Sequence, residues 1–148
     1  MKALIQRVSS ASVVVENEVV GKIGKGLLIF LGIRKDDTAK EADLLAEKIA
    51  HLRIFTDDAG KMNLSMKELQ LEALVVSQFT LYANLSGRRP DFIQAAPPGQ
   101  AEPLYQEFTC ALQKKIHQPI ATGRFGAKMD VQLVNDGPVT LLLEINNN

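Results

Sequence analysis

The segment LLIFLGI, residues 27–33, is apolar at every position except its glycine and carries no charge. An uninterrupted apolar run of this length predicts a central β-strand that is buried on both faces of a sheet. Upstream, ALIQRVSSASVVVE (residues 3–16) and VVGKI (residues 19–23) are rich in Val and Ile and are punctuated by glycines, which predicts strands joined by tight turns. Downstream, LEALVVSQFTLYA (residues 71–83) predicts a further strand. We therefore expect residues 27–33 to lie in the middle of a sheet.

Two helices are predicted between and after these strands. Thr38 and Glu41 form a capping-box pattern, so we expect a helix from there to about His51. A second helix is expected to start near Glu102-Pro103, where a proline suits the first turn. Their apolar positions recur with helical spacing and predict the buried faces: Ala42, Leu45, Ile49 and Leu52 in the first, and Leu104, Phe108, Leu112 and Ile116 in the second.

These elements predict a mixed α/β fold dominated by its sheet, with a compact β-barrel-like or two-sheet core and two main helices packed on the outside. Residues 1–148 are expected to form one domain, with residues 146–148 as a frayed tail. A composition of 46% hydrophobic and 23% charged residues is typical of a soluble globular protein. Lys plus Arg equals Asp plus Glu at 17 each, so no global basic field indicates a nucleic-acid partner, although local clusters could still contact phosphates.

The expected location is the cytoplasm. The single cysteine, Cys110, excludes an internal disulfide and fits a reducing compartment. Residues 1–15 do not resemble a signal peptide, because Gln6, Arg7 and three serines interrupt the apolar core. No run approaches the ~20 apolar residues that span a membrane, so we expect no membrane partner.

Near the C-terminus, MDVQLV (residues 129–134) and VTLLLEI (residues 139–145) read as strands separated by Asn135-Asp136-Gly137-Pro138. These four residue types are the ones most expected in a tight turn, and Pro138 cannot donate a hydrogen bond to a ladder. From these residues alone, a plain hairpin connection is the favoured interpretation.

Few side chains suggest conventional catalysis. His51 and His117 each fall in the last turn of a predicted helix and have no partner at ligand spacing, so we expect no metal and no cofactor. Cys110 is interpreted as a small buried apolar residue of the second helix. The glycines of residues 21–26 lack the spacing of a phosphate-binding loop and predict a β-turn.

Two segments remain as candidate sites. At Ser77–Tyr82 a buried strand runs into hydroxyl, amide and aromatic side chains, which either form a site held by the sheet or satisfy backbone groups where the strand ends. The basic loop Ser86–Pro90 is either a solvated turn or a phosphate-binding pair of arginines.

Several segments, taken together, resemble the D-aminoacyl-tRNA deacylase family. They are SQFTLYA with GRRPDF after it, GRFGAKMDVQLVNDGPVTLLLE, and the opening MKALIQRV followed by GKIGKGLLIFLGI. The likeness extends from Met1 to about Ile145 in the same order and spacing, and SQFT and NDGPVT together are far more specific than either alone.

The resemblance implies a homodimer without a cofactor that hydrolyses the ester between a D-amino acid and tRNA, and also releases glycine mischarged onto tRNA. It implies two signatures, Ser77–Thr80 and a Gly137-Pro138 dipeptide with a cis peptide bond, and the dipeptide of one subunit is expected to enter the active site of the other. Gln78, Phe79 and Thr80 are then the expected catalytic residues. The expected substrate-binding residues are Ser77, Gly137, Pro138, Phe125, Met129 and Arg7.

A filter made of backbone has a physical rationale. Cis X-Pro bonds make up only about 5–6% of X-Pro bonds in folded proteins, and the cis geometry can aim two neighbouring carbonyl oxygens in nearly the same direction. Two fixed oxygens can bind the substrate ammonium group and exclude an L side chain, while hydrogen or a D side chain has room. The resemblance suggests that Arg7 and Met129 hold the dipeptide; a surface charge is the alternative for Arg7.

For the chemical step we expect backbone N–H groups around Gln78–Thr80 to stabilise the oxyanion, at roughly 3–4 kcal/mol per donor. No histidine in either motif could activate Thr80 as a nucleophile, so attack by water, assisted by the tRNA 2′-OH, is favoured. Phe79 and Phe125 are suited to stack on the terminal adenosine, although both could equally be core residues.

Two other functions remain open. One is a dimeric β-rich module that binds RNA ends without hydrolysis through its basic residues, with strongly salt-dependent affinity. The other is an esterase of small D-amino acid derivatives, for which tRNA is irrelevant. Neither accounts for both motifs.

Overall fold

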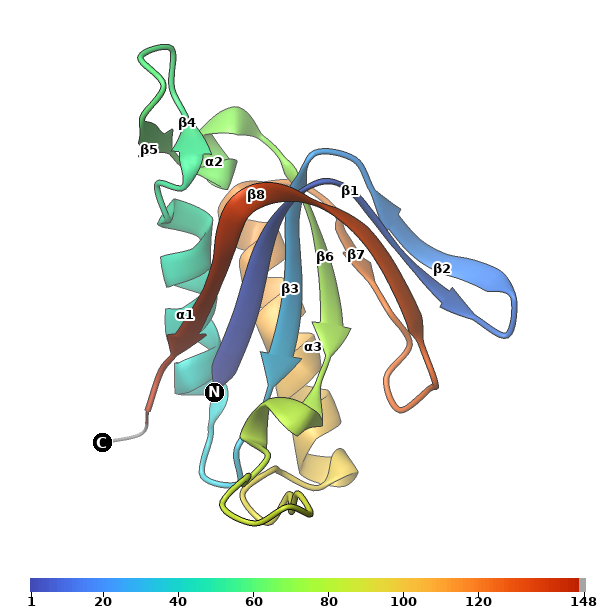
Figure 1. Cartoon of the computed structure of the whole chain (residues 1–148). Coiled ribbons are helices and arrows are strands. Elements are labelled where there is room, and N and C mark those ends of the chain that lie inside the picture. Colours follow the sequence, from blue (N-terminus) through green and yellow to red (C-terminus); the bar gives the residue numbers. More distant parts are fainter. Residues whose placement is uncertain (147–148) are drawn as a thin grey trace.

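A six-stranded sheet organises the chain (Figure 1). The computed structural model describes residues 1–146. The long first strand, β1 (Lys2–Val15), is the hub of the sheet. Its first half pairs antiparallel with β3 (Gly26–Gly32) and its second half with β2 (Glu18–Ile23). The last strand, β8 (Asp130–Glu144), runs antiparallel along the other edge of β1, so the two ends of the chain lie side by side.

The other side of the sheet is parallel. β3 pairs with β6 (Glu72–Ser77), and β6 pairs with β7 (Ile120–Thr122). Gly21 in β2 then allows β2 and β7 to approach each other, because a Cβ at this position would lie 2.3 Å from the carbonyl oxygen of Thr122. The sheet therefore curls into a nearly closed barrel, as predicted.

The central strand β3 is buried on both faces, which confirms the prediction for residues 27–33. Leu27, Ile29 and Leu31 belong to the core between the sheet and the helices. The alternate residue Leu28 belongs to a second core inside the curl of the sheet. Because successive side chains of a strand point to opposite faces, two cores on one strand require a continuous apolar run.

The two main helices cover the outer face of the sheet and pack against each other (Figure 1). α1 (Ala39–His51) begins at the predicted cap, where Thr38 and Glu41 form both hydrogen bonds of the capping box. α3 (Pro98–Ile116) starts earlier than predicted: Pro98, not Pro103, occupies the first turn. The predicted inner face of α3 is correct at Phe108, Leu112 and Ile116.

Three shorter elements complete the fold. β4 (Phe55–Thr56) and β5 (Met62–Leu64) form a small hairpin, and the short helix α2 (Met66–Leu69) leads into β6.

The predicted strand over residues 71–83 is shorter than expected, because β6 ends at Ser77 and a 3₁₀-helix, η1 (Phe79–Tyr82), follows. Within residues 1–146, no helix is long and apolar enough to cross a membrane.

Two further predictions were wrong. Cys110 is exposed, not buried: it lies two residues from the buried Phe108, which places it on the opposite side of a helix. Asn135–Pro138 is not a hairpin turn, because β8 is one strand that passes through these residues and stays paired with β1 on both sides of them. Of the tail predicted to be frayed, residues 147 and 148 lie outside the described residues.

Candidate active site

A cavity of about 580 Å³ opens at the carboxyl ends of the parallel strands β3 and β6. This is where loops meet in sheets with parallel strands, and where binding sites commonly form. The wall is built by the ends of β3 and β6 with the start of η1, by the loop before α3 and the first turn of that helix, and by the loop between β7 and β8 with the start of β8. The lining residues are Leu31, Ile33, Val76, Ser77, Gln78, Phe79, Phe92, Ala95, Ala96, Pro97, Pro98, Ala101, Phe125, Gly126, Ala127, Met129 and Val131.

The polar side of the cavity comes from the junction of β6 and η1. The backbone N–H of Gln78 donates to the carbonyl oxygen of Leu31 at 2.8 Å, which fixes this junction to β3. The side-chain amide of Gln78 donates to the hydroxyl of Thr80. Ser77 and Gln78 line the cavity, whereas Thr80 is exposed and does not line it.

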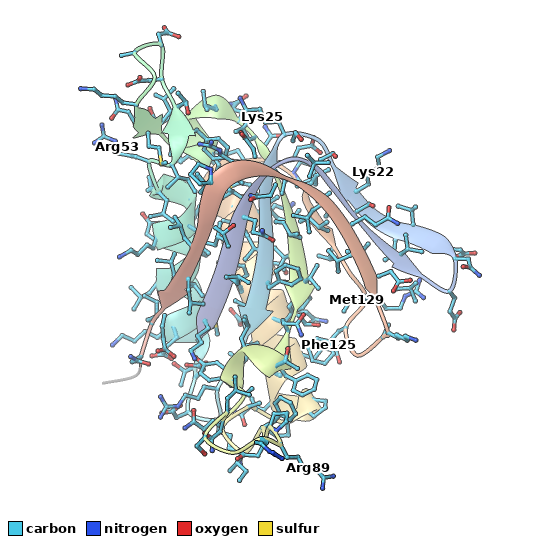
Figure 2. All side chains as sticks on the ribbon, viewed as in Figure 1. Lys22, Lys25, Arg53, Arg89, Phe125 and Met129 are labelled. Carbon is cyan, nitrogen blue, oxygen red and sulfur yellow. The ribbon has the colours of Figure 1, made fainter. Side chains whose placement is uncertain are left out.

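Aromatic rings form two walls of the cavity mouth. Phe79 is 57% exposed and packs edge-to-face on Phe92, with ring centroids 5.1 Å apart. Phe125 lies on the loop before β8 (Figure 2) and lines the same cavity. Its ring packs against that of Tyr105 in α3, with the two ring centroids 5.8 Å apart. Rings held this way offer exposed faces on which a base can stack.

Acid–base groups are missing from this wall: among the residues of this chain that line the cavity, none has an ionisable side chain. The buried hydroxyl of Tyr105, whose ring packs against Phe125, donates to the carbonyl oxygen of Val75 at 2.8 Å, and burial raises its pKa to about 12. It therefore stays protonated at neutral pH and cannot act as a general base. Residues 1–146 contain no group of three His, Cys, Asp or Glu side chains arranged to hold a metal ion.

The second signature lies elsewhere on the surface. Gln6 pairs with Thr140 and Val8 pairs with Asn135, so the single residue Arg7 on β1 faces four residues of β8. The extra residues, 136–139, form a bulge that carries Gly137 and Pro138 outward, and both are exposed. The peptide bond between them is cis.

Hydrogen bonds of Asn135 and the side chain of Arg7 hold this bulge in place. The side-chain amide of Asn135 donates to the carbonyl oxygens of Arg7 (2.9 Å) and Val139 (3.1 Å). Nε of Arg7 lies 3.0 Å from Oδ2 of Asp136, and its Nη1 donates to the carbonyl oxygen of Ile54 at 2.7 Å. Arg7 is 7% exposed, so it is a buried anchor beside the bulge and the surface-charge alternative is wrong.

The predicted site residues thus fall into two groups, and Thr80, which is exposed and does not line the cavity, belongs to neither. Ser77, Gln78, Phe79, Phe125 and Met129 all line the cavity. Arg7, Gly137 and Pro138 form or support the bulge on β8 and do not line it. Met129 therefore lies at the cavity of its own chain, while its expected role in holding the dipeptide stays a prediction.

Sequence reasoning missed several residues at both places. Phe92 and the segment 95–98 line the cavity, and Asn135 and Asp136 hold the bulge. The aromatic residue that follows the polar segment GRRPD was a usable signal for Phe92. No local pattern reveals the role of Asn135, because its acceptor on Arg7 is 128 residues away.

Comparisons with known proteins agree on one family. The family model for D-Tyr-tRNA(Tyr) deacylase matches residues 4–144. A D-aminoacyl-tRNA deacylase from Chloroflexus aurantiacus is 58% identical over 145 residues, covering 97% of this chain and 90% of the relative. One from Thermotoga petrophila is 52% identical and covers 97% of each chain.

Solved structures share the fold. One described as a c-Myc DNA unwinding element binding protein has a TM-score of 0.94 and 46% identity, and covers 99% of this chain and 100% of its own. A probable eukaryotic D-amino acid tRNA deacylase has a TM-score of 0.85 at 18% identity, covering 97% and 98%, which establishes a common fold alone.

The fold and these matches define an enzyme of the hydrolase class that removes amino acids from tRNA. The chain belongs to the D-Tyr-tRNA(Tyr) deacylase family, whose members with high identity to it are named D-aminoacyl-tRNA deacylases.

Proposed function

We propose that this chain acts as a homodimer that hydrolyses the ester bond of D-aminoacyl-tRNA, releases glycine from mischarged tRNA, and spares L-aminoacyl-tRNA. In this proposal Gly137-Pro138 of one subunit enters the cavity of the other. The observation that carries it is the separation of the two signatures: the dipeptide is exposed on a bulge and does not line the cavity of its own chain.

The surface around the bulge supports a second copy as the partner. Val134 and Leu142, on β8 to either side of the dipeptide, are 57% and 58% exposed. Large apolar side chains exposed along one strand favour an interface over contact with water. A twofold dimer would place the same strand on both sides of the interface and would deliver two dipeptides to two cavities.

The chirality filter follows from that placement. Carbonyl oxygens of Gly137 and Pro138 would accept from the substrate ammonium group and fix its Cα. An L side chain would then collide with the carbonyls, while the hydrogen of glycine or a D side chain would point away. The filter inspects only the handedness at Cα, so D-amino acids of different sizes are expected substrates.

Backbone groups and water would carry the chemical step. The N–H of Gln78 is already bonded to Leu31, so it is unavailable to an oxyanion. For the N–H groups of Phe79 and Thr80, at the start of η1, no acceptor is found within residues 1–146. These two donors are our candidates for the oxyanion, with water attacking and the tRNA 2′-OH assisting.

The test is a deacylation assay on one tRNA charged in parallel with D-tyrosine and L-tyrosine, and on a glycine tRNA charged with glycine. Release of D-tyrosine and glycine, with L-tyrosine spared, is the expected result. Equal release of D- and L-tyrosine would reject the filter. D-tyrosine ethyl ester serves as the control substrate: hydrolysis as fast as that of D-tyrosyl-tRNA would favour an esterase of small molecules.

A binding protein without activity is the second candidate, favoured by the name of the solved relative that is described as binding a DNA unwinding element. It predicts salt-dependent binding of nucleic acid and no release of any amino acid in the same assay.

A further inference from the structure

One loop at the cavity mouth is not used by the proposed reaction. Residues 84–93 form a closed loop, because Asn84 and Asp91 exchange backbone hydrogen bonds of 2.8 and 3.2 Å and a side-chain bond of 3.0 Å. Phe92, which directly follows Asp91 in this loop, lines the cavity and packs on Phe79. The loop is therefore a fixed extension of the rim of the cavity.

The loop concentrates positive charge on a chain whose formal net charge is zero. Arg88 and Arg89 at its tip are exposed, and within residues 1–146 neither takes part in an ion pair. The carboxylate of Asp91 is already engaged by Asn84 and by the backbone N–H of Ile93. Two arginines without partners beside an aromatic cavity fit an anionic ligand.

Apolar side chains accompany these arginines. Leu85 is 71% exposed and Ile93 is 68% exposed, one near each end of the loop. Surfaces that bind single-stranded nucleic acid combine positive charge for the phosphates with side chains, usually aromatic, against which the unstacked bases pack. Here the exposed aliphatic side chains of Leu85 and Ile93 offer such an apolar surface beside the two arginines.

We propose that residues 84–93 hold the single-stranded nucleotides at the 3′ end of the tRNA that lie immediately on the 5′ side of the terminal nucleotide, which carries the amino acid. Arg88 and Arg89 pair with its phosphates, and Leu85 and Ile93 contact its bases. This inference rests on the proposed function, since it takes the aminoacylated nucleotide to occupy the cavity. The inference adds to the proposed function the path along which the rest of the RNA leaves the cavity.

The test compares the double variant Arg88→Gln/Arg89→Gln with a matched control, Lys22→Gln/Lys25→Gln. Figure 2 shows Arg89 at the end of the molecule that holds Phe125, and Lys22 and Lys25 at the other end. Both pairs are exposed, so both variants are expected to fold. The substrates are D-tyrosyl-tRNA and 3′-O-D-tyrosyl-adenosine, which has no phosphodiester.

Each phosphate contact on a single strand adds about 0.7 to the steepness with which the logarithm of binding falls against the logarithm of salt concentration, so two contacts add about 1.4. They therefore account for a roughly sevenfold loss of kcat/KM between 50 and 200 mM salt. The loop variant should lose this part of the salt dependence on D-tyrosyl-tRNA, be slower than wild type at 50 mM, and hydrolyse the nucleoside ester at the wild-type rate. The control should match wild type throughout. Leu85→Ser/Ile93→Ser should slow D-tyrosyl-tRNA hydrolysis and leave the salt slope unchanged.

The outcomes separate the two proposals. A wild-type protein that releases D-tyrosine from neither substrate contradicts the proposed function itself. An active wild-type protein with a loop variant of equal rate and equal salt slope on D-tyrosyl-tRNA overturns the loop assignment alone. The loop assignment is also overturned if the control pair is equally impaired, or if the loop variant is equally slow on the nucleoside ester.

Discussion

Gly137 is exposed on the bulge of β8, and a Cβ added there would meet only Oδ1 of Asn135 at 3.8 Å, an ordinary contact. We therefore expect Gly137→Ala to change the free energy of unfolding by no more than about 0.5 kcal/mol. If this residue enters a partner's cavity, the methyl group would displace the substrate, and a misplacement of about 1 Å costs on the order of 100-fold in rate.

Urea unfolding and deacylation of D-tyrosyl-tRNA measure these two effects. Gly24→Ala is the control, because its added Cβ would also meet only a flexible side chain, Glu72 at 3.4 Å. Wild-type activity in a stable Gly137→Ala protein would count against any role of the dipeptide at the site.

Thr80 is the one hydroxyl of the SQFT signature outside the cavity wall, and it accepts a hydrogen bond from the amide of Gln78. Thr80→Val should keep kcat for D-tyrosyl-tRNA within about tenfold of wild type, because removing a true nucleophile costs on the order of 10⁴–10⁶. Single-turnover rates and substrate affinity should be measured together. Loss of the chemical step with unchanged affinity would identify Thr80 as a catalytic residue.

At the scale of elements, the start of α1 is fixed by Thr38. Its hydroxyl and backbone bond to Glu41, and the hydroxyl contact is the main reason that the pKa of the Glu41 carboxyl lies below its ordinary value. Thr38→Ala should lower the free energy of unfolding by about 1 kcal/mol at pH 7. Thr109→Ala is the control, because the hydroxyl of Thr109 donates only to the carbonyl oxygen of Gln106 in its own helix. This variant should lower the free energy of unfolding by less than Thr38→Ala does.

The pH dependence of this effect has a definite sign. A carboxyl whose folded pKa is depressed stabilises the protein fully above its unfolded pKa of about 4.3, and loses that contribution as the pH falls through the folded pKa. The difference between wild type and Thr38→Ala should therefore shrink in urea unfolding curves measured below pH 4. A difference that grows on acidification would contradict the assignment.

The elements also show what the sequence predicts well. α1 has a local start signal and one apolar stripe, and both were predicted correctly. The start of α3 was misplaced because Pro98 and Pro103 both suit a first turn, and Pro103 loses only one hydrogen bond, in the second turn. The turn expected at Asn135–Pro138 has the right residue types. Pairing with β1, more than a hundred residues away in the chain, overrides this local preference.

At the site, too, features marked by a local sequence motif could be predicted, whereas features that depend on contacts between remote segments could not. The SQFT segment and Phe125 were placed at a common site by family resemblance: Phe125 and the first three residues of the segment, Ser77–Phe79, line the cavity, whereas Thr80 does not. The anchoring of Arg7 by Asp136 and Ile54 depends on contacts between segments that are remote in the sequence, and no periodicity encodes them.

At the scale of the whole molecule, the proposal requires two chains for each site. A subunit with a blocked cavity, Ala95→Trp, keeps its dipeptide, and a Gly137→Ala subunit keeps its cavity. Each homodimer should be nearly inactive, whereas refolding the two together should recover about a quarter of the wild-type sites on random pairing. Differently tagged subunits show whether mixed dimers form; mixed dimers without recovered activity would mean that each chain uses its own dipeptide.

The pairing of the first strand with the last sets the order in which the protein can be completed during its synthesis. Residues 2–32 can form the β1–β2–β3 ladder early, but the other edge of β1 stays open until residues 130–144 have left the ribosome. Until then β1 exposes unpaired backbone groups to other nascent chains. A protein built this way is protected from mispairing by its final fifteen-residue strand, so truncation after Val139, which leaves Gly137-Pro138 in place, should already cause aggregation.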